Sequence, residues 1–313
     1  MDFFQQVWKK GEMKPLGRIL VWAFLLIFVY FSSGAWAGGI DERKGIWSEI
    51  LPGLSLTRFN ADLEAVEDVH LEVENPGLVV LRIDPEAFRF RLLSASELDG
   101  DSRSLDKWAR TYGLVAAINA GMFWSDQRTS TGYMRNEQHL NQGRIHPDYG
   151  GFLVFNPRKP DLPRIQIVDR YHRARWRNLL DKYASVVQNY RLIGRKREIA
   201  WQRRGKRYIA SCIAEDQEGR ILFIQNQMSL SMKNLGRVLL DLPLRIDVCI
   251  FTEGGHHAGL YLDTPTLTRM WPGSEDMGFW SRGERASIPN VVGVEPRKRS
   301  PKWQDFGIVP YGF

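Results

Sequence analysis

The chain has 313 residues and a formal net charge of +7, with 43% hydrophobic and 25% charged residues. These proportions are those of an ordinary globular protein, and they exclude a chain of disordered composition. No Pro/Gly/Ser-rich linker and no internal repeat marks a division, so one domain is expected after the N-terminal segment.

The first 37 residues have the layout of a signal peptide. Thirteen consecutive apolar residues, Ile19 to Phe31, follow a basic stretch, and Ala35 and Ala37 are the small residues that a signal peptidase accepts. Cleavage after Ala37 is one outcome. The alternative is an uncleaved anchor over residues 19–37, which approaches the roughly 20 residues needed to span a membrane.

Both outcomes predict an exported protein. It would be periplasmic or extracellular, or it would stay associated with the inner membrane through residues 19–37. Such a location argues against nucleic acid and nucleotide cofactors as partners, and it favours a phosphate-bearing envelope glycan. We expect residues 38–77 to be an N-terminal extension and residues 78–313 to be the functional domain.

Basic residues and cysteines bear on possible partners. Cys212 and Cys249 lie in apolar, strand-like segments; a disulfide between them is permitted in an exported protein, and we favour free thiols. Basic clusters bind polyanions such as phosphorylated glycans, lipid headgroups or cell-wall polymers, although a solvated basic face is the alternative for the first cluster. The clusters are Arg170, Arg173, Arg175 and Arg177, and then Arg191, Arg195, Lys196, Arg197, Arg203, Arg204, Lys206 and Arg207.

Apolar patterns along the chain predict mostly strands with a few helices. One helix is expected over residues 104–113, with Ser104 as N-cap and Gly113 as its end, and another over residues 229–242. Residues 78–84 and 88–94 are expected to form a hairpin. We therefore predict an α+β fold with mixed, largely antiparallel sheets. Further strands are expected over residues 114–119, 151–156, 164–169, 208–216, 220–227 and 245–253, with another after the glycine turn at 254–255.

Polar and glycine-containing stretches follow these apolar strands at their ends, where sites usually form. In one of them Glu253 leaves an apolar strand just before Gly254 and Gly255, and two glycines let a ligand come close to the backbone. The stretches are residues 119–123 with 131–137, residues 188–190, residues 206–207 and residues 252–257.

Taken in order, several of these segments resemble the phosphodiester glycosidase family, in which N-acetylglucosamine is removed from a phosphodiester on mannose. The family has an Asn-Gly/Ala-Gly turn after a buried strand, an Arg-led strand, an Asp-Gly-Gly turn after a helix and a strand, and a closing strand. The resemblance covers residues 78–295 and rests on order and spacing. The matching segments are Asn119 to Phe123, Arg207 to Ser211, Glu253 to His257, and Ile288 to Val294.

The sequence departs from the family pattern at its motifs. Glu253 stands where the family has Asp, Ser211 replaces a Gly of the Arg-led strand, and His256 and His257 follow the glycines in place of Ser. One extra methylene moves a carboxylate by about an ångström, a displacement that alters catalysis. The resemblance implies the fold and, beyond it, a hydrolase that cleaves the bond between a sugar's anomeric carbon and a phosphate.

That activity implies roles for particular side chains. Phosphate is already a good leaving group, so one carboxylate with positive charge near the phosphate could suffice. Glu253 would be the base or nucleophile, and Arg207 would bind the phosphate with Arg135 as helper. Asn119 would position the sugar, and either histidine could carry a proton. The predicted catalytic residues are Glu253, Arg207 and His256; the predicted substrate-binding residues are Asn119, Arg135, Gly254, Gly255, Gln188 and His257.

Structural alternatives stand beside these roles. Glu253 could instead accept hydrogen bonds from the backbone of its own turn, Arg207 could be a surface arginine, and Asn119 could cap the bend after its strand. No cofactor is expected. A divalent cation between the two histidines, Glu253 and Asp263 is a minority hypothesis, because adjacent histidines on a strand point in different directions.

Two rival functions remain open on the sequence. The first is a non-catalytic envelope protein that binds phosphorylated glycan or anionic lipid through the arginine clusters. The second is an accessory factor in exopolysaccharide biosynthesis.

Overall fold

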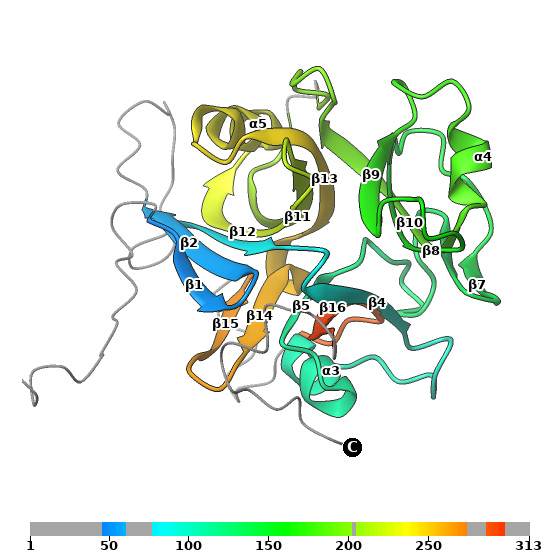
Figure 1. Ribbon diagram of the computed structural model, residues 1–313, viewed down its shortest axis with the longest axis horizontal. Helices are drawn as coiled ribbons and strands as arrows, with labels where there is room; N and C mark the ends of the chain where they lie inside the picture. Colours follow the sequence, from blue (N-terminus) through cyan, green and yellow to red (C-terminus); the bar gives the residue numbers. More distant parts are fainter. Residues whose placement is uncertain (1–45, 61–76, 202–204, 274–285, 298–313) are drawn as a thin grey trace, which may run out of the picture. The chain divides into compact units, whose positions relative to one another are not determined.

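The computed structural model describes residues 46–60, 77–201, 205–273 and 286–297, which form two β-sheets with a few helices (Figure 1). The larger sheet has eleven strands and the smaller has five. The strand pairs in these ranges are antiparallel. The predicted fold class is confirmed.

Nine strands of the larger sheet follow one hydrogen-bonded path. A tenth strand pairs with β10 of that path, and the eleventh pairs with the tenth. In order, the path is β1 (Ser48–Leu51), β2 (Leu54–Asn60), β3 (Gly77–Ile83), β12 (Ile221–Leu230), β11 (Tyr208–Asp216), β13 (Ile246–Gly254), β10 (Tyr183–Ile193), β6 (Met134–Asn136) and β7 (His139–Gln142). β8 (Gly151–Pro157) pairs with β10 and with β9 (Ile165–Asp169). The predicted N-terminal extension thus contributes β1 and β2.

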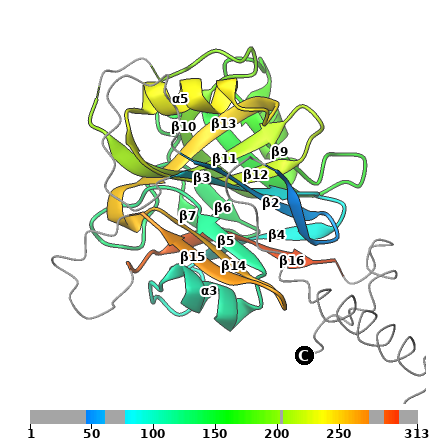
Figure 2. The same ribbon diagram turned by 90° about the vertical axis from the view of Figure 1, so that its left-hand side faces the viewer.

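The smaller sheet packs against the larger one. Its order is β15 (Thr268–Pro272), β14 (Gly259–Asp263), β5 (Ala116–Asn119), β16 (Asn290–Pro296) and β4 (Phe88–Ser94). Figure 2 shows α5 (Met232–Asp241) on the outer side of the larger sheet and α3 (Leu105–Tyr112) on the outer side of the smaller one. The short helix α4 (Trp176–Leu180) precedes β10.

Of the two long helices, α3 begins and ends as the sequence predicts, whereas α5 begins at Met232, later than the predicted residue 229, because residues 229–230 belong to β12. Ser104 is the N-cap of α3, and Gly113 ends it in the left-handed region (φ 65°), which glycine adopts without strain. Ser231 caps α5, because its hydroxyl accepts a hydrogen bond from the Asn234 N–H (3.3 Å). The buried apolar residues of α5 pack on the larger sheet in one cluster with Leu192 and with the strands around it.

The strands predicted over residues 78–84 and 88–94 form, but they do not make a hairpin, and this corrects the expectation. β3 pairs with β2 and β12 in the larger sheet, whereas β4 pairs with β16 in the smaller sheet. The reason is burial between the sheets: Phe90 on β4 meets Phe223 (ring centroids 6.2 Å apart) and Phe155 (6.4 Å) of the larger sheet.

Cys212 and Cys249 are free, buried thiols on the neighbouring strands β11 and β13, as favoured from the sequence. Within the described ranges, no helix is both long enough and apolar enough to cross a membrane. The predicted leader, residues 1–37, lies outside those ranges.

Candidate active site

The candidate active site lies where the chain passes from the larger sheet to the smaller one. β13 ends at Gly254, a 3-10 turn covers Gly255–His257, and β14 begins at Gly259. β11 runs beside this end, where Ser211 pairs with Glu253. Segments that are far apart in the sequence therefore meet at one place.

A buried hydrogen-bond network holds the turn after β13. Asn119 Nδ2 donates to the His257 carbonyl (2.9 Å), and Asn119 Oδ1 accepts from the Gly259 N–H (2.9 Å). The hydroxyl of Ser211 also accepts from the Gly259 N–H (2.8 Å) and donates to Gln225 Oε1 (2.6 Å). Because the backbone uses both amide atoms of Asn119, this residue positions the turn. These bonds use one of the two hydrogens on Asn119 Nδ2, so the expectation that its amide holds a sugar stays a prediction.

Glu253 supplies the buried carboxyl group of the site, with 9% of the residue exposed. Among the described residues, its carboxylate accepts one hydrogen bond, from the Gly254 N–H (2.9 Å). Burial raises the pKa of Glu253 to about 7, and the hydrogen bond from Gly254 opposes that rise. A carboxyl group that titrates near neutral pH can accept and release a proton under working conditions.

The two glycines after Glu253 have different functions. Gly255 has a φ of 69°, in the left-handed region, and no atom of the described residues lies within 4 Å of where a Cβ would stand. A Cβ on Gly254 would instead lie 3.1 Å from the Tyr208 ring. Gly255 thus permits the turn and leaves open space at the backbone, as a bound ligand would need, whereas Gly254 permits packing.

The two histidines of the turn differ in exposure. His256 is exposed, and His257 is half-buried with its ring edge against Phe123 (centroids 5.1 Å apart, 81° between planes). Burial, and next the charge of His256, lower the pKa of His257 to about 4. His257 is therefore neutral at pH 7, with one ring nitrogen as hydrogen-bond donor and the other as acceptor, which leaves His256 as the candidate proton carrier.

Gln188 lies on β10 with its whole amide engaged by backbone. Its Oε1 accepts from the N–H groups of Tyr133 (3.0 Å) and His146 (2.8 Å). Its Nε2 donates to the carbonyls of His146 (2.9 Å) and Tyr149 (2.8 Å). Gln188 thus fixes the loop that carries Tyr149, and the expected substrate contact is corrected.

Replacing Gln188 with Met should lower the free energy of unfolding by about 2–3 kcal/mol, because buried backbone groups lose their partners. Urea denaturation of the two chains measures this difference. Unchanged stability with weaker substrate binding would contradict the structural role and return Gln188 to the substrate-binding set.

The structure places the two predicted phosphate-binding arginines differently. Arg135 on β6 donates from Nη2 to the carbonyls of Leu180 (2.9 Å) and Tyr183 (2.8 Å), so it holds the turn before β10 and is not assigned to substrate. Arg207 is half-buried and immediately precedes β11. This end of β11 lies beside Gly254. Of the two, Arg207 is the one that lies next to the strand end beside the Glu253 turn.

Three arginines of the second basic cluster serve internal contacts. Arg191 pairs with the fully buried Asp169 (2.8 Å), and Arg195 pairs with Glu215 (3.0 Å). Arg197 Nη1 donates to a backbone carbonyl of β13 (2.7 Å). These side chains stabilise the fold, so the cluster is a smaller anion-binding surface than its sequence indicates.

Asn189 is a site residue that the sequence does not single out beyond the polar stretch 188–190. Its Nδ2 donates to the Ala120 carbonyl (2.8 Å), which ties β10 to the turn after β5. Its Oδ1 is buried and has no partner within the described ranges. A Cβ on Gly121 would lie 2.7 Å from this oxygen, so the glycine of the Asn-Ala-Gly turn permits the approach.

Aromatic rings extend from the site toward the surface, and the sequence pattern does not predict them as a group. Tyr149 lies 4.2 Å from Tyr190, and Tyr190 lies 4.7 Å from Trp201, between ring centroids. Burial chiefly raises the pKa of Tyr149 to about 12, and the charge of Glu253 contributes to the rise.

No group of three or more His, Cys, Asp and Glu side chains suited to a metal ion occurs in the part of the chain that the structure describes.

A family model for phosphodiester glycosidases matches residues 112–295, more than half of the chain. The chain belongs to the phosphodiester glycosidase family. The matched range includes the turn after β5, the Arg207 strand and the Glu253 turn, so the family resemblance predicted from the sequence is confirmed. No curated protein sequence gives a significant match.

Solved structures share the fold of this family member. The catalytic domain of zebrafish N-acetylglucosamine-1-phosphodiester alpha-N-acetylglucosaminidase, auto-inhibited by its pro-peptide, has a TM-score of 0.56 at 12% identity, over 80% of this chain and 86% of that one. A hypothetical protein from Synechocystis has a TM-score of 0.54 at 13% identity, over 82% of this chain and 64% of that one. At such identities the likeness concerns the fold alone.

Proposed function

We propose that this phosphodiester glycosidase family member hydrolyses a sugar-1-phosphodiester in an envelope glycan or glycolipid. The observation that carries the proposal is the buried Glu253 carboxyl at the end of β13, within the residues that the family model matches and two residues before the left-handed Gly255. The products are a free sugar and a phosphomonoester.

Glu253 acts on the anomeric carbon in this proposal. As a base it takes a proton from water, whose oxygen then bonds to the anomeric carbon while the carbon–oxygen bond to phosphate breaks. The electron pair of that bond leaves with the phosphate. Because the departing phosphomonoester is already a good leaving group, little protonation of its oxygen is needed, and the exposed His256 would supply it.

Arg207 is the proposed phosphate ligand. A guanidinium donates paired, charge-assisted hydrogen bonds to phosphate oxygens, and it stabilises the charge that grows on the departing group. Its location at the start of β11 supports this role, because that end of β11 lies beside the Glu253 turn. Asn119 and Ser211 support the reaction indirectly by fixing the same turn.

Export to the envelope is part of the proposal. Its support is the apolar run at residues 19–31 followed by Ala35 and Ala37. N-terminal sequencing of the purified protein tests it: a start at Gly38 indicates cleavage, and a start at Met1 in the membrane fraction indicates an anchor.

A non-catalytic glycan-binding or exopolysaccharide-accessory protein is the alternative. That alternative needs a surface rich in free cationic charge. Arg191, Arg195 and Arg197 are engaged internally, which favours the enzyme. The exposed Arg173 and Arg175 remain for binding, and residues 203–204 lie outside the described ranges.

Sugar release from a panel of sugar-1-phosphodiesters tests the activity. We expect a free sugar and a phosphomonoester to appear in equal amounts. Absence of turnover across the panel, together with salt-sensitive retention on anionic glycan, would support the binding protein instead.

The pH dependence of sugar release should follow the titration of Glu253. Since the pKa of this group is about 7, the reactive carboxylate form increases from pH 5.5 to 8.5. We therefore expect kcat/KM to rise through about pH 7 and to level off above it. A fall through the same pH range would make Glu253 a proton donor and contradict its role as base.

A further inference from the structure

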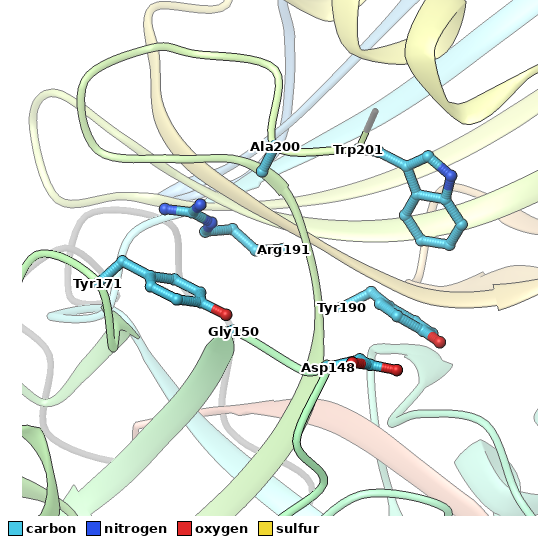
Figure 3. A pocket seen from close by; sticks show the side chains of 7 residues that line it. All are labelled: Asp148, Gly150, Tyr171, Tyr190, Arg191, Ala200 and Trp201. Carbon is cyan, nitrogen blue, oxygen red and sulfur yellow. The ribbon is translucent and has the colours of Figure 1, made fainter. Parts of the chain in front are cut away.

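An open depression of about 250 Å³ lies beside the aromatic rings that extend from the site (Figure 3). Its volume lies below the range of about 300–1,000 Å³ typical of sites for drug-sized ligands, so it suits a small group. Figure 3 shows Tyr190, Trp201 and Asp148 on one side of the depression, and Tyr171 with Arg191 on the other. The two sides differ in what they leave open to a ligand.

The Tyr171 side is already occupied by cations of the protein itself. The Arg191 guanidinium lies 4.6 Å from the centre of the Tyr171 ring, and the Arg170 guanidinium lies 4.8 Å from it. Arg191 Nη1 also pairs with Asp169 (2.8 Å) and Glu198 (3.1 Å), so two carboxylates match its charge. Arg191 therefore adds little attraction for an anion in the depression.

The opposite side presents two aromatic rings that are held from behind. Tyr190 and Trp201 lie 4.7 Å apart between ring centroids, with 56° between their planes, so together they form a corner. Tyr190 packs on the buried Tyr149 (4.2 Å between centroids). Trp201 packs on the buried Phe251 (5.7 Å). Rings fixed in this way lose little conformational freedom when a ligand binds.

Asp148 adds a negative charge on the side of this corner. The residue is exposed, and its backbone N–H donates to His146 Nδ1 (3.2 Å). Within the described ranges its carboxylate has no hydrogen bond or ion pair. Of the two charged residues that line the depression, Arg191 is matched by carboxylates and Asp148 is not matched by a cation. The charge left over is thus negative, and it favours a cationic ligand.

A trimethylammonium group matches this combination of surfaces. Its positive charge is attracted to the faces of Trp and Tyr rings within about 6 Å, and its methyl groups pack on the same rings. The Asp148 carboxylate supplies the opposite charge. A phosphate or carboxylate ligand would meet Asp148 as a like charge, and a neutral apolar group would gain nothing from it.

We propose that the corner formed by Tyr190, Trp201 and Asp148 binds a trimethylammonium group of the kind that choline carries. The group can belong to a soluble amino alcohol or to the headgroup of a lipid, and its chemistry is the same in both. This inference goes beyond the proposed function, because binding at the corner requires no turnover at Glu253.

Calorimetric titration of the purified protein with choline tests the site. The matched control ligand is 3,3-dimethyl-1-butanol, which has the shape of choline without its charge. At constant ionic strength we expect choline to bind with a Kd on the order of 1 mM, and the neutral analogue to bind at least about tenfold more weakly.

Variants of the corner identify the groups that bind. Asp148→Asn and Trp201→Ala should each weaken choline binding by about tenfold, whereas Trp201→Phe should keep most of it. Asp101→Asn and Trp124→Ala are the matched controls, because both residues are exposed and neither lines the depression. Asp148→Asn changes an exposed side chain, so it tests the site even if Trp201→Ala fails to fold.

Vesicles distinguish the two sources of the group. Sedimentation with phosphatidylcholine vesicles, but not with phosphatidylglycerol vesicles, that is lost in Asp148→Asn supports the site with a lipid headgroup as its ligand. Binding of free choline without vesicle binding supports it with a soluble ligand. No binding of choline, equal binding of the neutral analogue, or unchanged binding in Asp148→Asn would overturn the site. The proposed function is measured separately by sugar release and stands in each case.

Discussion

Replacing Glu253 with Gln is expected to lower kcat for sugar release by about 10²–10⁴-fold, the range of a general base. The amide keeps the size of the carboxyl and can still meet the Gly254 N–H through its oxygen, so binding should change much less. Steady-state kinetics on a sugar-1-phosphodiester separate kcat from KM. Equal kcat in the two chains would remove Glu253 from the mechanism.

A stability measurement tests whether the loss of kcat in the Glu253→Gln variant comes from the missing base or from unfolding. The pKa of Glu253 in the folded chain is about 7, above its ordinary value of 4.5, so the folded state binds the proton more tightly. The contribution of Glu253 to the free energy of unfolding therefore falls as pH rises from 4.5 to 7 and is constant above pH 7. The Gln variant lacks this fall, and above pH 7 it should be more stable than the wild type by about 1–3 kcal/mol. If the Gln variant were less stable than the wild type, unfolding would account for its inactivity, and the loss would not show that Glu253 is the base.

Replacing Arg195 with Met should lower the free energy of unfolding by about 3–5 kcal/mol, the cost of leaving a buried charge without its partner. Arg195 Nη2 lies 3.0 Å from Glu215 Oε2 and 2.7 Å from the Ile167 carbonyl oxygen, and Nη1 bonds Asp247. Burial raises the pKa of Glu215, and the charge of Arg195 opposes that rise. Denaturant unfolding at pH 7.5 measures the change.

Two further variants identify the cause. Adding Glu215→Gln to Arg195→Met should restore part of the lost stability, because the uncompensated charge is gone. Arg173→Met removes an exposed arginine of the first basic cluster and should change stability by less than about 0.5 kcal/mol. An Arg195 variant as stable as the Arg173 variant, with anion binding lost, would show that Arg195 belongs to a binding surface.

The sequence predicts local elements better than their pairing. Ser104 and Gly113 delimit α3 because capping depends on neighbouring residues. The hairpin predicted for β3 and β4 does not form, because Phe90 is buried between two sheets, a contact with residues far along the chain. β10 is missed as well, since polar residues 188–190 interrupt its apolar pattern for reasons that only the loop at Tyr149 reveals.

For the candidate site too, local patterns are predicted from the sequence and long-range contacts are not. Glu253 and its glycines are predicted as a unit, because a carboxylate between an apolar strand and two glycines is a local pattern. Asn119 is found, but its partners are not, since they lie at residues 257 and 259. Trp201 has no sequence signal of its own, and only the fold places it beside Tyr190.

Hydrolysis of a sugar-1-phosphodiester in water enriched in ¹⁸O tests the central claim most directly, because the label reports which bond breaks. Attack at the anomeric carbon breaks the carbon–oxygen bond. We expect mass spectrometry to find the phosphomonoester product unlabelled and the released sugar labelled. A phosphomonoester carrying ¹⁸O would mean attack at phosphorus and would contradict a glycosidase mechanism at Glu253.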